Sequence, residues 1–169
     1  MLINIVFVCK ENICRSAIAE YCLRQYITDI IGIELTNKHF LIQSAGLQPY
    51  KGRWKCRLLK KMREVASFFG LETIKDTHRS KPLTEEILNA GNVKFVYCMN
   101  QKTIDAAKQQ FPNGTYNLLY KDKNMPEDPY GRRTLDYAGC VILIRDRCKV
   151  LASSFVDFLK TTVPLKWFD

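Results

Sequence analysis

Residues 2–8 constrain the fold most, because all of them except Asn4 are apolar and most are β-branched or aromatic. A continuous run of this kind is typical of a central parallel strand covered on both faces, rather than of a half-exposed strand. Helices must then cover both faces of the sheet. The next stretch, residues 16–30, predicts the first of them, with an apolar stripe at helical spacing formed by Ile18, Ala19, Cys22, Leu23 and Tyr26.

Strand and helix patterns continue to alternate along the chain. Further strands are expected at residues 40–44, 93–99 and 116–119, and further helices around 58–69 and from about 100 to 110. A long final helix has a predicted core face made of Ala138, Val141, Ile142, Cys148, Ala152, Phe155 and Leu159. This pattern predicts an α/β fold in one domain spanning residues 1–169, with a four-stranded parallel sheet flanked by helices. In such folds ligands bind beyond the carboxyl ends of the strands.

The composition narrows the class of protein. A chain of 169 residues with 47% hydrophobic and 25% charged residues fits one compact domain and excludes a disordered or low-complexity chain. The formal net charge of +9 favours an anionic partner or substrate. Seven cysteines, an odd number at irregular spacings, indicate reduced thiols and a cytoplasmic protein. No apolar run is long enough for a membrane span, and the first residues lack the basic start of a signal peptide.

The segment that leaves the first strand carries a candidate chemical site. Cys9 ends the predicted strand, Arg15 and Ser16 open the predicted helix, and the residues between them are Lys10, Glu11, Asn12, Ile13 and Cys14. A loop of this kind directs backbone N–H groups at an anion, and the helix N-terminus favours a thiolate at Cys9. The guanidinium of Arg15 matches two phosphate oxygens, and the hydroxyl of Ser16 can stabilise the thiolate. The sequence therefore predicts a phosphate-binding loop between strand 1 and helix 1, with Cys9 as nucleophile.

A second candidate lies in the segment Glu127-Asp128-Pro129-Tyr130. A thiolate that attacks a phosphate ester needs a proton donor for the departing oxygen, and the Asp128 carboxyl can supply it. Proline restricts the backbone beside this aspartate, and the ring of Tyr130 can stack beside an aromatic leaving group.

These motifs together resemble the low-molecular-weight protein tyrosine phosphatase family. The resemblance rests on the Cys9–Ser16 loop, on Asp128-Pro129-Tyr130 before the last helix, and on Ser44-Ala45-Gly46, His78-Arg79 and Met99 between them. It implies a phosphocysteine on Cys9, Arg15 as phosphate clamp, Ser16 as thiolate stabiliser, and Asp128 as general acid and then base.

The resemblance also implies a supporting network and a substrate. Asn12, Ser44 and His78 match the residues that hold the loop, and Tyr50 and Tyr130 match the aromatic walls of the cleft. The expected substrate is a phosphotyrosine-containing protein, inorganic phosphate and other oxyanions are expected inhibitors, and neither a metal nor a cofactor is required.

Three residues depart from the family pattern. Glu11 replaces a usual glycine, Ala17 a proline and Asn100 an aspartate. Asn100 can still cap a helix, and Ala17 loses only a preset first turn. Glu11 matters more, because it places a carboxylate near a dianion and because glycine permits backbone angles that glutamate tolerates poorly.

Two other functions remain open from the sequence. An arsenate reductase on the same fold would pass oxidation from Cys9 to two further cysteines, but Cys98 stands alone and the next cysteine is Cys140. A binding module without turnover could use the loop or the basic segment 51–63, which holds seven cations. That segment could bind nucleic acid or dock an acidic phosphoprotein, yet a solvated helix face is the commoner reading and nucleic acid is not expected.

Overall fold

The computed structural model describes residues 1–49, 60–71, 78–120 and 127–163. Its centre is a four-stranded parallel sheet with the strand order β2-β1-β3-β4. The strands are β1 (Ile3–Cys9), β2 (Phe40–Gly46), β3 (Val93–Cys98) and β4 (Tyr116–Leu118). Because all strands run in the same direction, their carboxyl ends meet at one edge of the sheet. Cys9 and Gly46 are paired there.

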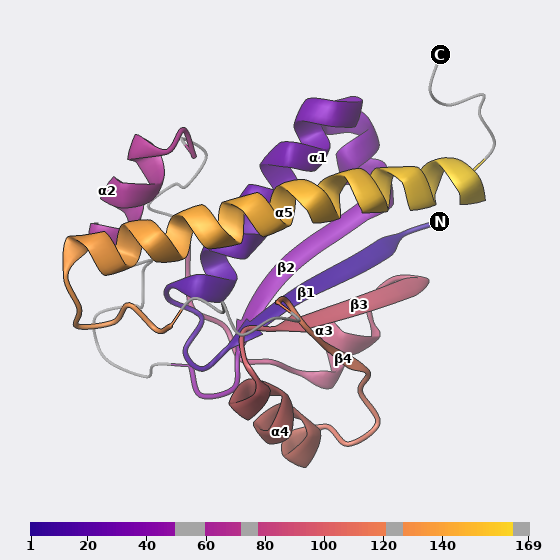
Figure 1. Cartoon of the computed structure of the whole chain (residues 1–169). Helices are drawn as coiled ribbons and strands as arrows, with labels where there is room; N and C mark the ends of the chain where they lie inside the picture. Colours follow the sequence, from indigo (N-terminus) through magenta and orange to yellow (C-terminus); the bar gives the residue numbers. More distant parts are fainter. Residues whose placement is uncertain (50–59, 72–77, 121–126, 164–169) are drawn as a thin grey trace.

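Helices cover both faces of the sheet, as the sequence predicts (Figure 1). On one face lie α1 (Arg15–His39), α2 (Lys60–Phe68) and the long α5 (Thr134–Thr162), and α1 packs along α5. On the other face lie α3 (Glu85–Asn89) and α4 (Gln101–Gln110). The fold is therefore a three-layer α/β arrangement, and the expected fold class is confirmed.

Strand β1 explains why its residues are apolar without interruption. Ile3, Ile5 and Phe7 belong to the core beneath α1 and α5, whereas Val6 and Val8 belong to the core beneath α3 and α4. Successive side chains of a strand point to opposite faces, so a strand buried on both faces needs apolar residues at almost every position.

Two helices differ from the expectation. The first helix was expected to end near residue 30, but α1 continues to His39 across an interruption at Gly32, whose φ is +79°. In α5 the expected core residues Ala138 and Ile142 are only partly buried, and Cys140 and Ile144 are buried instead. The sequence 141–144 is apolar at four consecutive positions, so its periodicity does not fix which face points inward.

The expected ends of two helices are confirmed. Asn100 caps α4, because its side-chain oxygen accepts hydrogen bonds from the backbone nitrogen of Thr103 at 2.8 Å and from its hydroxyl at 2.7 Å. Gly70 follows α2 with a φ of +78°, a conformation that favours glycine. The short helix α3 was not expected; it begins after Thr84, which caps it. Among the described helices, none combines the length and the apolar character needed to cross a bilayer.

Candidate active site

The loop between β1 and α1 curls around the thiol of Cys9. The Sγ atom lies 3.0 Å from the hydroxyl oxygen of Ser16 and 3.2 Å from the backbone nitrogen of Asn12, which donates to it. Asn12 has a φ of 58° and is the single non-glycine residue with positive φ in the described part of the chain. Asparagine tolerates this left-handed conformation better than most residues. The turn at Asn12 thereby directs a backbone N–H group at the sulfur.

The side chain of Asn12 is fully buried and forms the centre of a hydrogen-bond network. Its Nδ2 donates to the hydroxyls of Ser16 at 3.0 Å and Ser44 at 2.8 Å, and its Oδ1 accepts from the backbone nitrogen of Lys81 at 3.1 Å. Since Nδ2 can only donate, Ser16 Oγ accepts there, and its own proton is available for Cys9. The network therefore orients the Ser16 hydroxyl toward the Cys9 sulfur.

His78 supports the same loop from a separate segment. Its Nε2 lies 2.7 Å from the carbonyl oxygen of Asn12, so this nitrogen must carry a proton and donate it. Burial lowers the pKa of His78, although the Asn12 carbonyl and the carboxylate of Glu20 oppose that effect. A neutral ring with its proton on Nε2 satisfies this contact.

Two residues that support the site, Glu20 and Gly46, were not among the site residues predicted from the sequence. Glu20, on α1, accepts a hydrogen bond from the hydroxyl of Ser44 at 2.5 Å, which fixes Ser44 as acceptor for Asn12. Gly46 lies against the loop backbone, where a Cβ would be 2.9 Å from the carbonyl carbon of Glu11. The spacing of Glu20 on α1 and the Ser-Ala-Gly run were visible signals, but their contacts depend on the pairing of β1 with β2.

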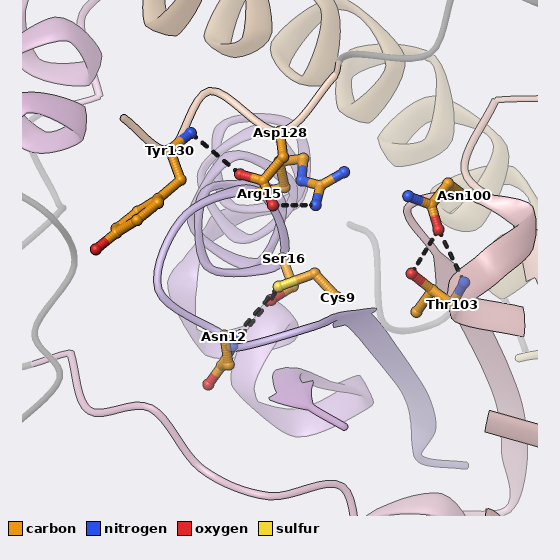
Figure 2. Close-up of polar contacts among 8 residues, drawn as sticks. All are labelled: Cys9, Asn12, Arg15, Ser16, Asn100, Thr103, Asp128 and Tyr130. Atoms are coloured by element: carbon orange, nitrogen blue, oxygen red, sulfur yellow. Dashed lines mark hydrogen bonds and ion pairs between the residues drawn. The ribbon is translucent and has the colours of Figure 1, made fainter. Parts of the chain in front are cut away.

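Arg15 and Asp128 meet above the thiol (Figure 2). Arg15 Nη2 donates to Asp128 Oδ2 at 2.6 Å, with the side chain of Arg15 buried and that of Asp128 half exposed. The other oxygen of Asp128 accepts from the backbone nitrogen of Tyr130 at 3.2 Å. The fold thus brings together two residues from opposite ends of the chain that the sequence predicts for one site.

A small cup opens over the loop, with a volume of about 230 Å³. Most of the expected residues line it, namely Cys9, Lys10, Glu11, Ile13, Cys14, Arg15, Asp128 and Tyr130. Among these lining residues Tyr130 is largely exposed, with 62% of its surface accessible. Ser16, Asn12, Ser44 and His78 lie behind the loop and are buried. Tyr50, the other expected wall, lies outside the described residues, as does much of the basic segment 51–63.

The described end of that basic segment packs against neighbouring elements. Lys61 Nζ donates to the carbonyl oxygen of Arg132 at 3.2 Å and lies 5.3 Å from the centre of the Tyr137 ring. This lysine is therefore engaged within the protein, between α2 and the start of α5.

Glu11 does not have the backbone conformation that would call for glycine. Its φ lies outside the positive region, and its carbonyl oxygen accepts a hydrogen bond from the hydroxyl of Ser80 at 2.6 Å. The expectation that glutamate strains the loop is wrong, because Asn12 takes the left-handed position instead. Glu11 lines the cup, so its negative charge is the property by which it would repel an anion there.

Two further thiols lie close to the site, Cys14 in the loop and Cys140 on α5, and both are buried. Burial raises the pKa of Cys140 to about 12, although the positive charge of Arg15 lowers it. Burial also raises the pKa of Cys14 well above its usual range, and negative charge on Cys9, Asp128 and Cys140 adds to the effect. Both thiols are therefore protonated at neutral pH.

Comparison with known proteins agrees with this geometry. The chain is 25% identical over 173 residues to the low molecular weight protein-tyrosine-phosphatase PtpA of Staphylococcus haemolyticus (strain JCSC1435), covering 98% of this chain and 99% of that relative. The YwlE arginine phosphatase from Geobacillus stearothermophilus superposes with a TM-score of 0.75 at 20% identity, covering 95% of this chain and 97% of that one.

The tyrosine phosphatase Wzb from Escherichia coli K30, in complex with sulphate, superposes with a TM-score of 0.71 at 22% identity, covering 92% of this chain and 99% of that one. At these identities the two superpositions show a shared fold. The family itself is shown by residues 4–161, which match the low molecular weight phosphotyrosine protein phosphatases. This chain, a cysteine-based phosphatase, belongs to the low molecular weight phosphotyrosine protein phosphatase family.

Proposed function

We propose that the protein hydrolyses phosphotyrosine in a protein substrate, through a phosphocysteine on Cys9. The observation that carries the proposal is the environment of the Cys9 sulfur. This atom accepts hydrogen bonds from the Ser16 hydroxyl at 3.0 Å and from the Asn12 backbone N–H at 3.2 Å. Hydrogen bonds to the charged form of a group favour that form. The thiolate required of a nucleophile is thereby stabilised directly below the cup.

The first step transfers the phosphoryl group to sulfur. The substrate phosphate enters the cup. Arg15 releases the Asp128 carboxylate and donates hydrogen bonds to two phosphate oxygens instead. The Cys9 thiolate attacks phosphorus, so that an S–P bond forms while the bond from phosphorus to the phenol oxygen breaks. Asp128, released from Arg15, takes up a proton from the solvent and gives it to the departing oxygen, so that tyrosine leaves as the neutral phenol.

The second step returns the enzyme to its starting state. Asp128, now a carboxylate, takes a proton from water, and the water oxygen attacks phosphorus as the S–P bond breaks. Inorganic phosphate leaves, Asp128 releases the proton to the solvent and pairs with Arg15 again, and Ser16 stabilises the returning thiolate. Because product and substrate share the phosphate group, inorganic phosphate and similar oxyanions should inhibit competitively.

The side chains at the rim favour an aromatic leaving group. Ile13 contributes an apolar surface inside the cup, and the ring of Tyr130 stands at its edge. Such walls suit the ring of phosphotyrosine, whereas a phosphoarginine guanidinium is planar and charged. Because the structurally similar YwlE protein is an arginine phosphatase, a phosphoarginine peptide is the informative comparison substrate.

The two other functions have less support. An arsenate reductase relay depends on thiols with an appreciable thiolate fraction, and burial raises the pKa of both Cys98 and Cys140 to about 12. A binding module would need no thiolate beneath the phosphate. A nucleophilic thiol also works only while it is reduced, which supports the proposal of a cytoplasmic protein.

The decisive experiment measures hydrolysis of an aryl phosphate by the wild type, by Cys9→Ser and by Cys22→Ser. Cys22 is a fully buried core residue of α1, outside the loop around Cys9, and is the matched control. We expect burst kinetics in the wild type, no turnover in Cys9→Ser, and turnover close to that of the wild type in Cys22→Ser. Full activity in a folded Cys9→Ser variant would refute the mechanism, and faster turnover of phosphoarginine than of phosphotyrosine peptides would refute the substrate class.

A further inference from the structure

We propose that a groove beside the cup binds an acidic residue of the substrate, next in sequence to the phosphotyrosine, and this proposal rests on the proposed function. The groove has a volume of about 800 Å³, against about 230 Å³ for the cup. It lies between the loop after β2, one side of α4 from its N-terminus to Gln110, and the segment around Asp128. Its size falls within the range of about 300–1,000 Å³ that is usual for binding sites.

The groove and the cup share the lining residues Lys10, Arg15 and Asp128, so they lie side by side. In Figure 2 the ion pair of Arg15 and Asp128 lies between Tyr130 on one side, which lines the cup, and Asn100 and Thr103 on the other, which line the groove. A substrate whose phosphate enters the cup therefore has its chain at the mouth of the groove.

The side chains that line the groove include two more cations than carboxylates. Four cations line it, Lys10, Arg15, Lys102 and Arg132, together with the carboxylates of Glu127 and Asp128. Both carboxylates are already paired, Asp128 with Arg15 and Glu127 with Arg132. Lys10 and Lys102 have no carboxylate partner in the described residues and are exposed. An anionic side chain of the substrate would supply the missing partner.

The remaining walls fit a peptide rather than a free inorganic anion. Leu47 and Ala106 contribute apolar surface, and Gln48 and Gln110 contribute amides that can bond with a peptide backbone. The Gln48 backbone nitrogen donates to the carbonyl oxygen of Lys10 at 2.8 Å, so this wall is attached to the phosphate-binding loop itself. The groove thus offers a peptide both apolar contact and hydrogen bonds, with cations at its side.

The test compares three phosphotyrosine peptides of otherwise identical sequence. The residues on either side of the phosphotyrosine are glutamate in the first peptide, glutamine in the second and lysine in the third. Wild type should show a kcat/KM about threefold to tenfold higher for the glutamate than for the lysine peptide, since exposed charge pairs contribute effects of this size. Lys102→Glu should abolish or reverse this preference. Added salt should reduce the preference in the wild type, because the charges are exposed.

The matched control is Lys108→Glu, which makes the same charge change on α4 at an exposed position outside the groove. Lys108→Glu should keep the preference for the glutamate peptide, and Lys102→Glu should hydrolyse a small aryl phosphate as fast as the wild type. An equal preference in Lys102→Glu and the wild type would overturn the proposal, as would an oligonucleotide that competes better than the acidic peptide. If the wild type itself did not hydrolyse the aryl phosphate, the proposed function would be refuted instead.

Discussion

Gly46 is the point at which β2 touches the phosphate-binding loop, and Gly46→Ala should damage both stability and turnover. A Cβ at this position would lie 2.9 Å from the carbonyl carbon of Glu11, and 3.0 Å from both the backbone nitrogen of Asn12 and the carbonyl oxygen of Lys10. All three are backbone atoms, so no side chain can rotate away. The Gly46 backbone itself is not left-handed, and the requirement for glycine is one of space.

The expected magnitude follows from the overlap. Carbon contacts are optimal at about 3.5–4.0 Å, so the loop must retreat by about half an ångström or more. Overpacking of this kind costs about 1–3 kcal/mol of stability, which corresponds to a fall in Tm of about 2–12 °C for a domain of this size. A misplacement of 1 Å at a reacting centre can cost about 100-fold in rate, so we expect about a tenfold loss of kcat/KM.

The assay combines thermal unfolding with hydrolysis of an aryl phosphate and inhibition by vanadate. Gly139→Ala is the control, because nothing lies within 4 Å of a Cβ at this helical position. It should leave turnover unchanged and raise stability by about 0.5–1 kcal/mol, the usual advantage of alanine over glycine in a helix. A Gly46→Ala protein with wild-type Tm, turnover and vanadate affinity would show that the loop is not held by this contact.

Three further predictions concern the cup. Asp128→Asn should lower kcat by about 10²–10⁴-fold for a substrate with a poor leaving group and less for one with a good leaving group; equal losses for both would make Asp128 purely structural. Glu11→Gly should tighten phosphate or vanadate inhibition up to about fivefold, because a nearby carboxylate repels the dianion by up to about 1 kcal/mol, and the difference should shrink in salt; unchanged affinity would mean that Glu11 points away. Brief alkylation at pH 7, mapped by mass spectrometry, should modify Cys9 and spare Cys14 and Cys140, whose pKa values burial raises; modification of Cys140 before Cys9 would contradict this assignment.

The sequence predicts the fold and the phosphate-binding loop because both depend on short-range patterns. The apolar run of β1 and the residues that follow it are contiguous, so the strand, the turn and the start of α1 can be recognised without tertiary information. Asn100 is recognised as a cap for the same reason, since its bonds reach only Thr103.

The remaining features depend on contacts between distant segments. Gly46 must be small because of Glu11 and Asn12, and this constraint exists only once β2 pairs with β1. The inward face of α5 is ambiguous in the sequence and is decided by packing against α1, with Cys148 directed at the Ala19 carbonyl at 3.6 Å. The left-handed turn at Asn12 rather than at Glu11 is also a property of the assembled loop.

In the resting enzyme Asp128 is paired with Arg15, so its carboxylate competes with every incoming anion for the Arg15 guanidinium. A carboxylate tethered within reach of the guanidinium is present at a fixed effective concentration, which any incoming anion must exceed. Chloride or a single carboxylate gains little by the exchange, whereas a phosphate dianion gains two bonds to the guanidinium and several to the loop. The same exchange runs in reverse when Asp128 returns to Arg15 and helps to expel inorganic phosphate. This one ion pair thus selects against weakly bound anions and shortens the residence time of the phosphate product.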